Sequence, residues 1–191
     1  MLYPTLTRST MAAFLATLAL NVTVGAQTTA LSPQITIDNF ARVNDAYHRG
    51  AQPVGDDYAD LKALGVKTII NLTSEEDDSY DERQAVEAQG MRYVHIPMST
   101  RRNPTDKELE TFFAVVNSAD SGPVYVHCVG GRHRTGVMTA VYRMTRDGLS
   151  GEQAFKEMKQ FKYGPDFLHP EFKKFVHEYD VRRTVTTNTG G

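Results

Sequence analysis

The sequence predicts a single α/β domain in which a central, mainly parallel sheet is flanked by helices. Short apolar or β-branched runs alternate along the chain with segments of helical periodicity, an order typical of layered α/β proteins. The length of 191 residues suits one ordinary domain. Hydrophobic residues make up 40% of the chain and charged residues 23%, the profile of a globular protein with a core.

The first elements are predicted in the order strand, helix, strand. A strand is expected near residues 42–49. Residues 56–64 have apolar side chains at helical spacing and are followed by Gly65, a common helix stop. Residues 66–72 (VKTIINL) form a β-branched run short enough to be a buried strand.

The middle of the chain continues this alternation. An acidic stretch at residues 75–78 leads into a polar helix that ends near Gln89, and residues 91–96 are the next predicted strand. Residues 123–127 form a further strand, and a glycine-containing loop then opens a helix from about Arg134. Because ligands bind beyond the carboxyl ends of the strands in open parallel sheets, the loop after residue 127 is the expected position of a site.

Two later helices carry a capping box at their start. Thr105 with Glu108 predicts a helix that bears an apolar face, and Ser150 with Gln153 predicts another. A last helix follows Pro170.

Residues 1–26 have the features of a secretory signal peptide. Arg8 is their only charged residue, an apolar stretch covers residues 11–20, and small residues at 24–26 predict cleavage before Gln27. The alternative is a buried or membrane-spanning helix, but polar residues interrupt the segment, and a spanning helix needs about 20 mostly apolar residues. We therefore expect an exported protein, periplasmic or secreted, with no membrane insertion after the signal is removed.

Charge and cysteine content exclude several kinds of site. The formal net charge of −2 argues against general nucleic-acid binding. No histidine and cysteine cluster has the spacing of a metal site, so neither a metal nor a cofactor is expected. The single cysteine, Cys128, cannot form an internal disulfide, and a lone thiol in an oxidising compartment is prone to oxidation. Chemistry at the thiol explains its presence best.

The segment from Cys128 to Arg134 is suited to binding an anion. Five residues separate the two at a strand-to-helix turn, where backbone N–H groups converge and the helix N-terminus adds its positive dipole end. Gly130 and Gly131 allow positive φ and a close approach of the ligand. The same field favours the thiolate form of Cys128, which is the nucleophile.

Neighbouring side chains complete this prediction. Arg134 can hold two phosphate oxygens and neutralise charge in the transition state. Thr135 can donate a hydrogen bond to the sulfur when it leaves, and His127 is expected to orient the loop.

At this point the sequence resembles a known family. Residues 127–135 (HCVGGRHRT) resemble the signature loop of protein tyrosine and dual-specificity phosphatases. The end of the loop is most similar to the atypical dual-specificity phosphatases of plants and fungi and their bacterial relatives. Residues 49–53 (RGAQP) and 65–72 (GVKTIINL) follow the same order, so the resemblance covers roughly residues 43–179.

The resemblance implies a dual-specificity phosphatase-like fold and a phosphocysteine mechanism that needs no metal. Cys128 would form the covalent phosphoenzyme and Arg134 would bind the phosphoryl group, with Asn71 supporting the loop from behind. The remaining substrate-binding residues would be Val129, Gly130, Gly131, Arg132 and His133.

The predicted boundaries follow from these elements. They are a signal peptide at residues 1–26, a leader at 27–41, a phosphatase domain at 42–180 and a disordered tail at 181–191.

The general acid is the least defined part of the prediction. The family supplies an aspartate from a loop that here corresponds to residues 97–106, and Asp106 is its only carboxylate. Asp106 also suits a plain helix-start role, because a carboxylate is stabilised at a helix N-terminus. Both roles are open at this stage.

Several basic residues have two open roles. Arg132 and His133 either face the substrate or pack against the acidic stretch at residues 75–78. Arg101 and Arg102 are either a solvated pair or a binding site for additional phosphates. The scattered histidines are expected to be structural: His48, His95, His169 and His177.

The leading hypothesis is hydrolysis of phosphate monoesters, on phosphotyrosine and by extension phosphoserine and phosphothreonine. An alternative keeps this mechanism with inositol polyphosphates as substrates. Two weaker alternatives are a rhodanese-type sulfurtransferase and a module that binds phosphorylated partners without turnover. The expected partner is therefore a phosphorylated protein or a small phosphate ester.

Overall fold

The computed structural model describes residues 34–77 and 80–182. The predicted signal peptide, residues 27–33 of the predicted leader, and residues 183–191 of the predicted tail lie outside the described residues. In the part of the chain that is described, no helix is long and apolar enough to cross a membrane.

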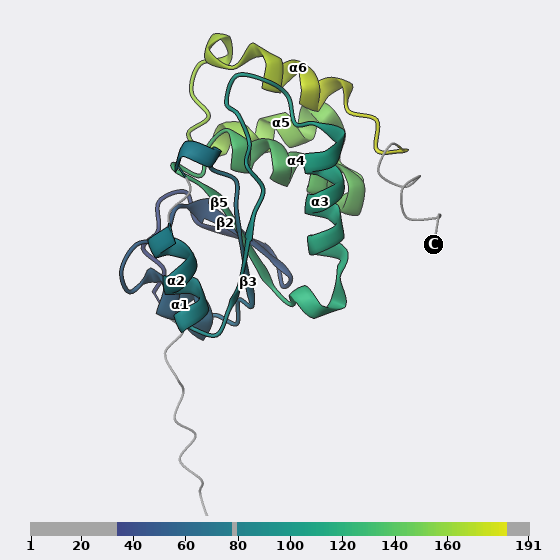
Figure 1. Ribbon diagram of the computed structural model, residues 1–191. Helices are drawn as coiled ribbons and strands as arrows, with labels where there is room; N and C mark the ends of the chain where they lie inside the picture. The colour runs from purple at the N-terminus through teal and green to yellow at the C-terminus, as the bar shows by residue number, and fades with distance from the viewer. Residues whose placement is uncertain (1–33, 78–79, 183–191) are drawn as a thin grey trace, which may run out of the picture. The chain divides into compact units, whose positions relative to one another are not determined.

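A five-stranded sheet with the order β1-β2-β5-β3-β4 forms the centre of the domain (Figure 1). β1 pairs with β2 in the antiparallel direction, and all other neighbours are parallel. The prediction of a mainly parallel α/β domain is therefore confirmed. The strands are β1 (Ala41–Asn44), β2 (Tyr47–Ala51), β3 (Thr68–Asn71), β4 (Arg92–His95) and β5 (Val124–Cys128).

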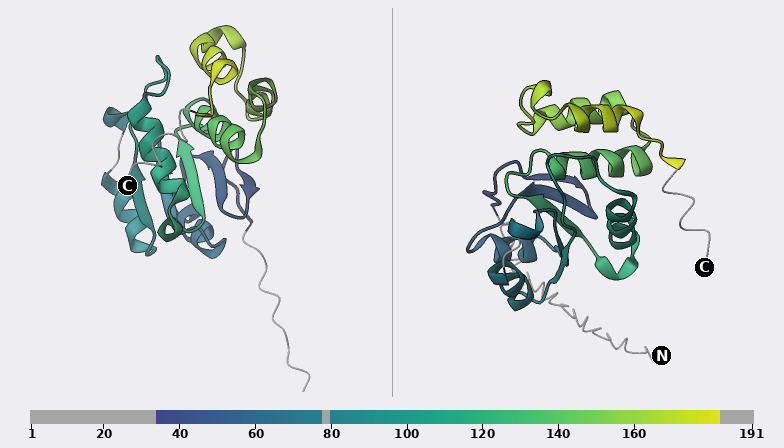
Figure 2. Two further views of the ribbon diagram at one scale, coloured as in Figure 1. Left: turned by 90° about the vertical axis from the view of Figure 1, so that its right-hand side faces the viewer. Right: turned by 45° about the horizontal axis from the view of Figure 1, so that its top comes forward.

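Helices cover both faces of the sheet (Figures 1 and 2). One hydrophobic core lies beneath α1 and α2, and a larger core lies on the other face beneath α3 and α4, with α5 and α6 packed on α4. The helices are α1 (Asp57–Ala63), α2 (Tyr80–Ala88), α3 (Asp106–Asn117), α4 (Arg134–Asp147), α5 (Gly151–Gln160) and α6 (Pro170–Glu178). Short 3-10 helices are η1 (Glu75–Asp77), η2 (Ala119–Ser121) and η3 (Asp166–Leu168).

Both predicted capping boxes are confirmed. Thr105 accepts from the backbone N–H of Glu108 at the start of α3, and the Glu108 side chain accepts from the N–H of Thr105. Ser150 and Gln153 form the same reciprocal pair at the start of α5. Each box satisfies two N–H groups that a helix N-terminus otherwise leaves without an acceptor.

The prediction of one strand at residues 42–49 is wrong. The chain instead forms the β1–β2 hairpin, and the Asn44 side chain accepts from the N–H of Ala46 at the turn, at 2.9 Å. Asparagine and aspartate favour such turns because their side chains hydrogen-bond to the backbone two residues on. Asn44 and Asp45 are therefore the residues in the sequence that indicate this turn.

The domain begins before residue 42, inside the predicted leader. Ile37 is buried in the core beneath α1 and α2. The carbonyl of Asp38 accepts from the N–H of Ala51 at 2.8 Å, which fixes the segment to the end of β2. Residues 36–41 are thus part of the folded unit.

Candidate active site

The predicted anion-binding loop lies where β5 ends and α4 begins. β5 lies between β2 and β3, so its last residues, His127 and Cys128, are buried at the carboxyl edge of the sheet. The loop continues to His133, and α4 starts at Arg134. The strand, loop and helix therefore have the order that the sequence predicted.

Three consecutive carbonyl groups of this loop are bonded from the side of β2. The bonds run from Gln52 N to Val129 O (3.2 Å), from Asn39 Nδ2 to Gly130 O (2.7 Å) and from Arg49 Nη2 to Gly131 O. Because the N–H and C=O groups of a peptide unit point in opposite directions, the loop N–H groups are directed away from β2. They are the donors that a bound anion requires.

Gly131 is required by its close contact with β2. Its φ is +64°, and a Cβ at this position would lie 2.4 Å from the carbonyl carbon of Gly50. The sequence suggested positive φ for both loop glycines, but in the structure Gly131 has it and Gly130 does not. Any side chain at Gly131 would push the loop away from the strand.

Cys128 is buried, yet its surroundings favour the thiolate. Burial raises the pKa of the Cys128 thiol, but the hydroxyl and backbone N–H of Thr135, the charge of Arg134 and the backbone N–H of Arg132 lower it. The net pKa lies below the ordinary value of a thiol. A thiolate beside an arginine and a helix N-terminus is the usual state of a nucleophilic cysteine.

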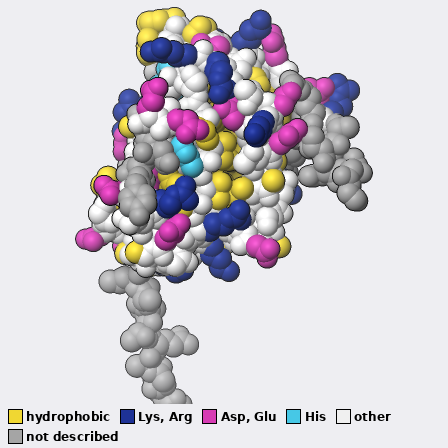
Figure 3. All heavy atoms as spheres, in the orientation of Figure 1, with side chains coloured by type: hydrophobic (Ala, Val, Ile, Leu, Met, Phe, Trp, Pro, Cys, Tyr) yellow, Lys and Arg dark blue, Asp and Glu magenta, His cyan; other side chains and the backbone are white. Residues whose placement is uncertain are grey.

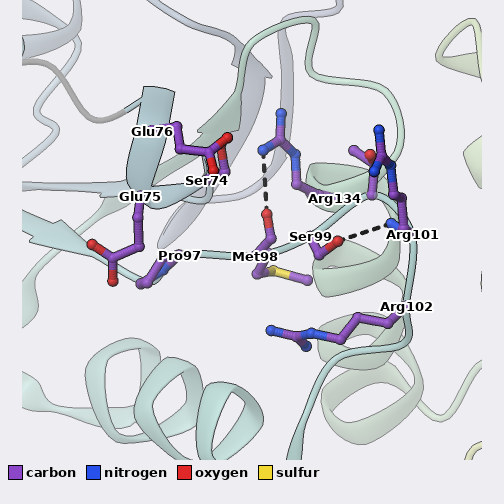
Figure 4. Close-up of a pocket in the computed structure, with 10 residues that line it drawn as sticks. Ser74, Glu75, Glu76, Pro97, Met98, Ser99, Arg101, Arg102 and Arg134 are labelled. Atoms are coloured by element: carbon purple, nitrogen blue, oxygen red, sulfur yellow. Dashed lines mark hydrogen bonds between the residues drawn. The ribbon is translucent and has the colours of Figure 1, made fainter.

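Arg134 connects the loop to a cavity of about 570 Å³, a size typical of small-molecule sites. Its side chain is 7% exposed, and Nη1 donates to the carbonyl of Met98 at 3.3 Å. Figure 4 shows Arg134 between Glu76 and Arg101, with Glu75 on the far side of Glu76. The cavity is lined by residues that follow β3 and β4, in addition to Arg134.

A buried carboxylate, Glu82 of α2, joins the strand ends beneath the site. Its Oε2 accepts from Asn71 Nδ2 at 3.0 Å and from Gln52 Nε2 at 2.9 Å. Its Oε1 lies 3.0 Å from His127 Nε2 and 3.4 Å from the hydroxyl of Tyr58. Glu82 therefore links α1, β3, β5 and the segment after β2.

Sequence reasoning missed Glu82, although one signal was present. Glu82 and Val86 lie four residues apart and are both buried on the same face of α2, so a carboxylate occupies a core position. Asn71 was expected to support the loop, and its side chain instead bonds to Glu82 and to Tyr93. Its effect on the loop passes through Glu82 and His127.

The family to which these features point is shown by sequence comparison. The profile of the DSP-PTPase phosphatase fused to NAD+ kinase (PTP-NADK) matches residues 32–176. The chain belongs to this phosphatase family. The sequence-based assignment to cysteine-dependent dual-specificity phosphatases is thereby confirmed.

Known relatives support the same family. TpbA, a dual specificity protein phosphatase of Pseudomonas aeruginosa, is 27% identical over 152 residues, covering 80% of this chain and 66% of TpbA. A crystal structure of TpbA in complex with pTyr has a TM-score of 0.68 at 25% identity, covering 85% of this chain and 100% of that chain. Inositol diphosphatase DSP2 of Oryza sativa is 28% identical over 111 residues, covering 55% of this chain and 53% of the rice protein. The chain spans less than two thirds of the length of these curated relatives.

Asp106 belongs to the start of α3, which follows the segment that lines the cavity. It is exposed at the first position of α3, immediately after the N-cap Thr105. The carboxylates that line the cavity are those of Glu75 and Glu76, and its lining includes neither Asp106 nor the nucleophile position Cys128. This placement suits the helix-start role, and the general-acid role of Asp106 stays a prediction.

The two basic residues of the phosphatase loop contact other segments than the sequence suggested. Arg132 Nη2 lies 3.9 Å from Asp38 Oδ2, rather than against the acidic stretch. His133 Nε2 is 2.8 Å from the carbonyl of Tyr163, and its ring centroid is 4.0 Å from that of His169. Burial is the main cause that lowers the pKa of His133. His169, which the sequence analysis expected to be structural, thus packs against His133 of the loop.

Arg101 and Arg102 do not act as a pair. Arg102 forms a bidentate ion pair with Glu108, at 2.9 and 2.7 Å, and so supports the capping box of α3. Arg101 is exposed and lines the cavity. Arg102 lines the same cavity, but its guanidinium is engaged by Glu108.

Glu82→Leu is predicted to lower the free energy of unfolding by about 3 kcal/mol, because it leaves buried donors without their acceptor. Urea denaturation followed by circular dichroism measures the change. Glu87→Leu, an exposed position on the same helix, is the control and is expected to stay within about 0.5 kcal/mol. Equal effects of the two substitutions would contradict the role assigned to Glu82.

Proposed function

We propose that this protein hydrolyses phosphate monoesters through a phosphocysteine, with Cys128 as nucleophile and Arg134 as the group that binds the phosphoryl oxygens. The observation that carries the proposal is the loop whose carbonyls are held toward β2. Its N–H groups and the N-terminus of α4 then provide a preorganised cradle beside a thiol of lowered pKa.

The reaction proceeds in two displacements. The Cys128 thiolate attacks phosphorus, the bond from phosphorus to the ester oxygen breaks, and that oxygen leaves with the electron pair and takes a proton from a general acid. Water then attacks phosphorus, loses a proton to a base, and the sulfur leaves as thiolate. Thr135 donates to the sulfur at this step, and Arg134 neutralises charge on the phosphoryl oxygens in both transition states.

Phosphotyrosine in a polypeptide is the substrate class that we favour, with phosphoserine and phosphothreonine as an extension. TpbA has been crystallised with pTyr. The cavity carries Glu75 and Glu76 in addition to Arg134, and these carboxylates repel a molecule with phosphates on all sides. A phosphorylated side chain presents one phosphate to Arg134 and neutral or mixed charge elsewhere. On the face shown in Figure 3, basic and acidic side chains are interspersed, which suits such a partner.

Inositol polyphosphates are the second candidate. The observations in their favour are the exposed Arg101 at the cavity and the likeness to a rice inositol diphosphatase. A second phosphate could bind Arg101 while the first binds Arg134. The acidic wall of the cavity is the physical reason for placing this candidate second. Membership of the phosphatase family disfavours the sulfurtransferase alternative, and turnover would exclude a binding module.

The first experiment measures phosphate release by the purified protein from an aryl phosphate, a phosphotyrosine peptide and inositol hexakisphosphate, in the presence of a chelator. Turnover is expected on the first two, and Cys128→Ser is expected to abolish it because the nucleophile is lost. Activity that survives this substitution would refute the assignment of the nucleophile.

The same assay tests the substrate class. Replacing Glu75 and Glu76 by glutamine is expected to raise kcat/KM for inositol hexakisphosphate about threefold to tenfold, since each exposed charge contributes up to about 1 kcal/mol. The aryl phosphate should be unaffected. The matched control replaces Glu87 and Glu110, which are exposed elsewhere on the domain. A wild-type preference for the inositol phosphate would reverse the order of the two candidates.

Asp106 is proposed as the general acid despite its exposed position, because it is the only carboxylate in residues 97–106. Asp106→Asn is then expected to slow hydrolysis of esters with poor leaving groups by about 100-fold, while activated aryl esters are little affected. Leaving-group series for the two proteins measure this difference. Equal losses on both kinds of ester would refute the role.

We also propose that the protein is exported, on the basis of residues 1–26. Their single positive charge, apolar stretch and small residues before Gln27 support a cleaved signal. N-terminal sequencing of the protein from the extracytoplasmic fraction is expected to begin at Gln27. An intact Met1 on mature material would refute cleavage.

A further inference from the structure

Arg49 of β2 is a fully buried cation whose hydrogen bond helps to hold the loop but whose positive charge has no role in the mechanism above. Its exposure is 0%, and it is among the largest fully buried side chains of the domain. The guanidinium donates to the carbonyl of Gly131 and stacks on the ring of Phe161, with Cζ 3.9 Å from the ring centroid. Within residues 34–77 and 80–182, it forms no ion pair with a carboxylate.

Such a residue is costly without a nearby anion. A buried charge is tolerated when it is paired or strongly hydrogen-bonded, and one carbonyl and one aromatic face offset only part of the loss of hydration. A neutral side chain of similar size would fill the same space without this desolvation cost. A buried arginine at this position is stabilised by a negative charge close by.

The strand register shows where that charge lies. Arg49 pairs with Val126 on the adjacent parallel strand, and Ala51 pairs with Cys128. Because alternate residues of a strand share a face, Arg49, Val126 and Cys128 project on the same side of the sheet. The guanidinium reaches forward to Gly131, in the loop that begins immediately after Cys128. The register and the bond to Gly131 therefore place Arg49 on the same side of the sheet as the Cys128 thiolate, beneath the loop that follows it.

The electrostatics agree with this geometry. Burial lowers the pKa of Arg49, and four ionisable groups raise it again: in decreasing order Tyr47, Cys128, Glu157 and Tyr125. The charge of Arg134, at the start of α4, lowers the pKa of the same Cys128 thiol. The two arginines therefore lie on different elements, one on β2 beneath the loop and one on α4 at the cavity.

We infer that Arg49 is a positioning residue of the phosphatase site, a buried counter-charge that stabilises the Cys128 thiolate and holds Gly131 in the phosphate-binding loop. The extension to a bound phosphoryl group rests on the proposed function, whereas the effect on the thiolate does not. The positive charge and the hydrogen bond make separable contributions. Lysine at this position keeps the positive charge but lacks the planar guanidinium. Methionine keeps the length of the side chain but has neither the charge nor a hydrogen-bond donor.

The test is the pH dependence of Cys128 alkylation by iodoacetamide in the full chain, where Cys128 is the only thiol. A folded thiol of lowered pKa reacts at pH values where an ordinary thiol is protonated. Arg49→Met is expected to reduce the alkylation rate at pH 6 about tenfold and to leave the rate at pH 10 unchanged, because loss of an adjacent charge shifts a pKa by about one unit or more. Arg49→Lys should retain most of the rate at pH 6.

Phe161→Leu is the matched control, because it removes the stacking partner and leaves the charge in place. It should lower thermal stability without changing the alkylation profile. A folded Arg49→Met with a wild-type profile would overturn the inference, as would equal shifts for the methionine and lysine variants. If Arg49→Met does not fold, Arg49→Gln replaces it under the same criteria.

The assay also separates this inference from the proposed function, because alkylation needs no phosphatase turnover. Aryl phosphate hydrolysis by the same variants provides the second measurement. A shifted thiol titration in a protein without turnover would support Arg49 and contradict the function. Normal turnover with an unshifted thiol titration in Arg49→Met would support the proposed function and contradict the role of Arg49.

Discussion

The site depends on one constraint, the direction of three peptide units in the loop after β5. Their carbonyls are bonded by Gln52, Asn39 and Arg49, all on or beside β2. These bonds leave the N–H groups to face the anion, so the geometry of the cradle exists before a ligand arrives. Preorganised donors of this kind stabilise charge without the cost of reorienting at the moment of reaction. The sulfur of Cys128 and the clamp of Arg134 are useful only around a loop already held in this way.

Two buried charges support the ends of β5 and its neighbours in different ways. Glu82 receives donors from several elements and is well compensated, so it acts as a junction that fixes strand ends at one edge of the sheet. Arg49 is compensated poorly by the groups that surround it. A satisfied buried ion contributes fixed geometry, whereas an incompletely satisfied one raises the affinity of its surroundings for the opposite charge. The second property is the one a thiolate and a phosphoryl group require.

The sequence revealed the features that depend on neighbours along the chain. The capping boxes at Thr105 and Ser150 span three residues, and the loop from Cys128 to Arg134 spans six, so short-range chemistry was sufficient to find them. The contacts that hold the loop are long-range: Asn39 and Gly130 are 91 residues apart, and Arg49 and Gly131 are 82 apart. No local pattern marks such pairs. The β1–β2 hairpin was missed for another reason, because its turn is formed by polar residues inside a continuous β-like run.

Residues 36–41, at the start of the domain, belong to the fold because they contact both the core and the phosphate loop. Residues 36–41 look like a polar approach to the first strand, yet Ile37 fills the core and Asn39 bonds the loop at Gly130. Asp38 also lies beside Arg132 and is bonded by Lys162. This segment therefore connects the phosphate loop to β2 and to the region after α5. A domain boundary drawn from the hydrophobic pattern alone excludes residues 36–41. A boundary drawn from the contacts that hold the phosphate loop includes them. The burial of Ile37 agrees with the second boundary.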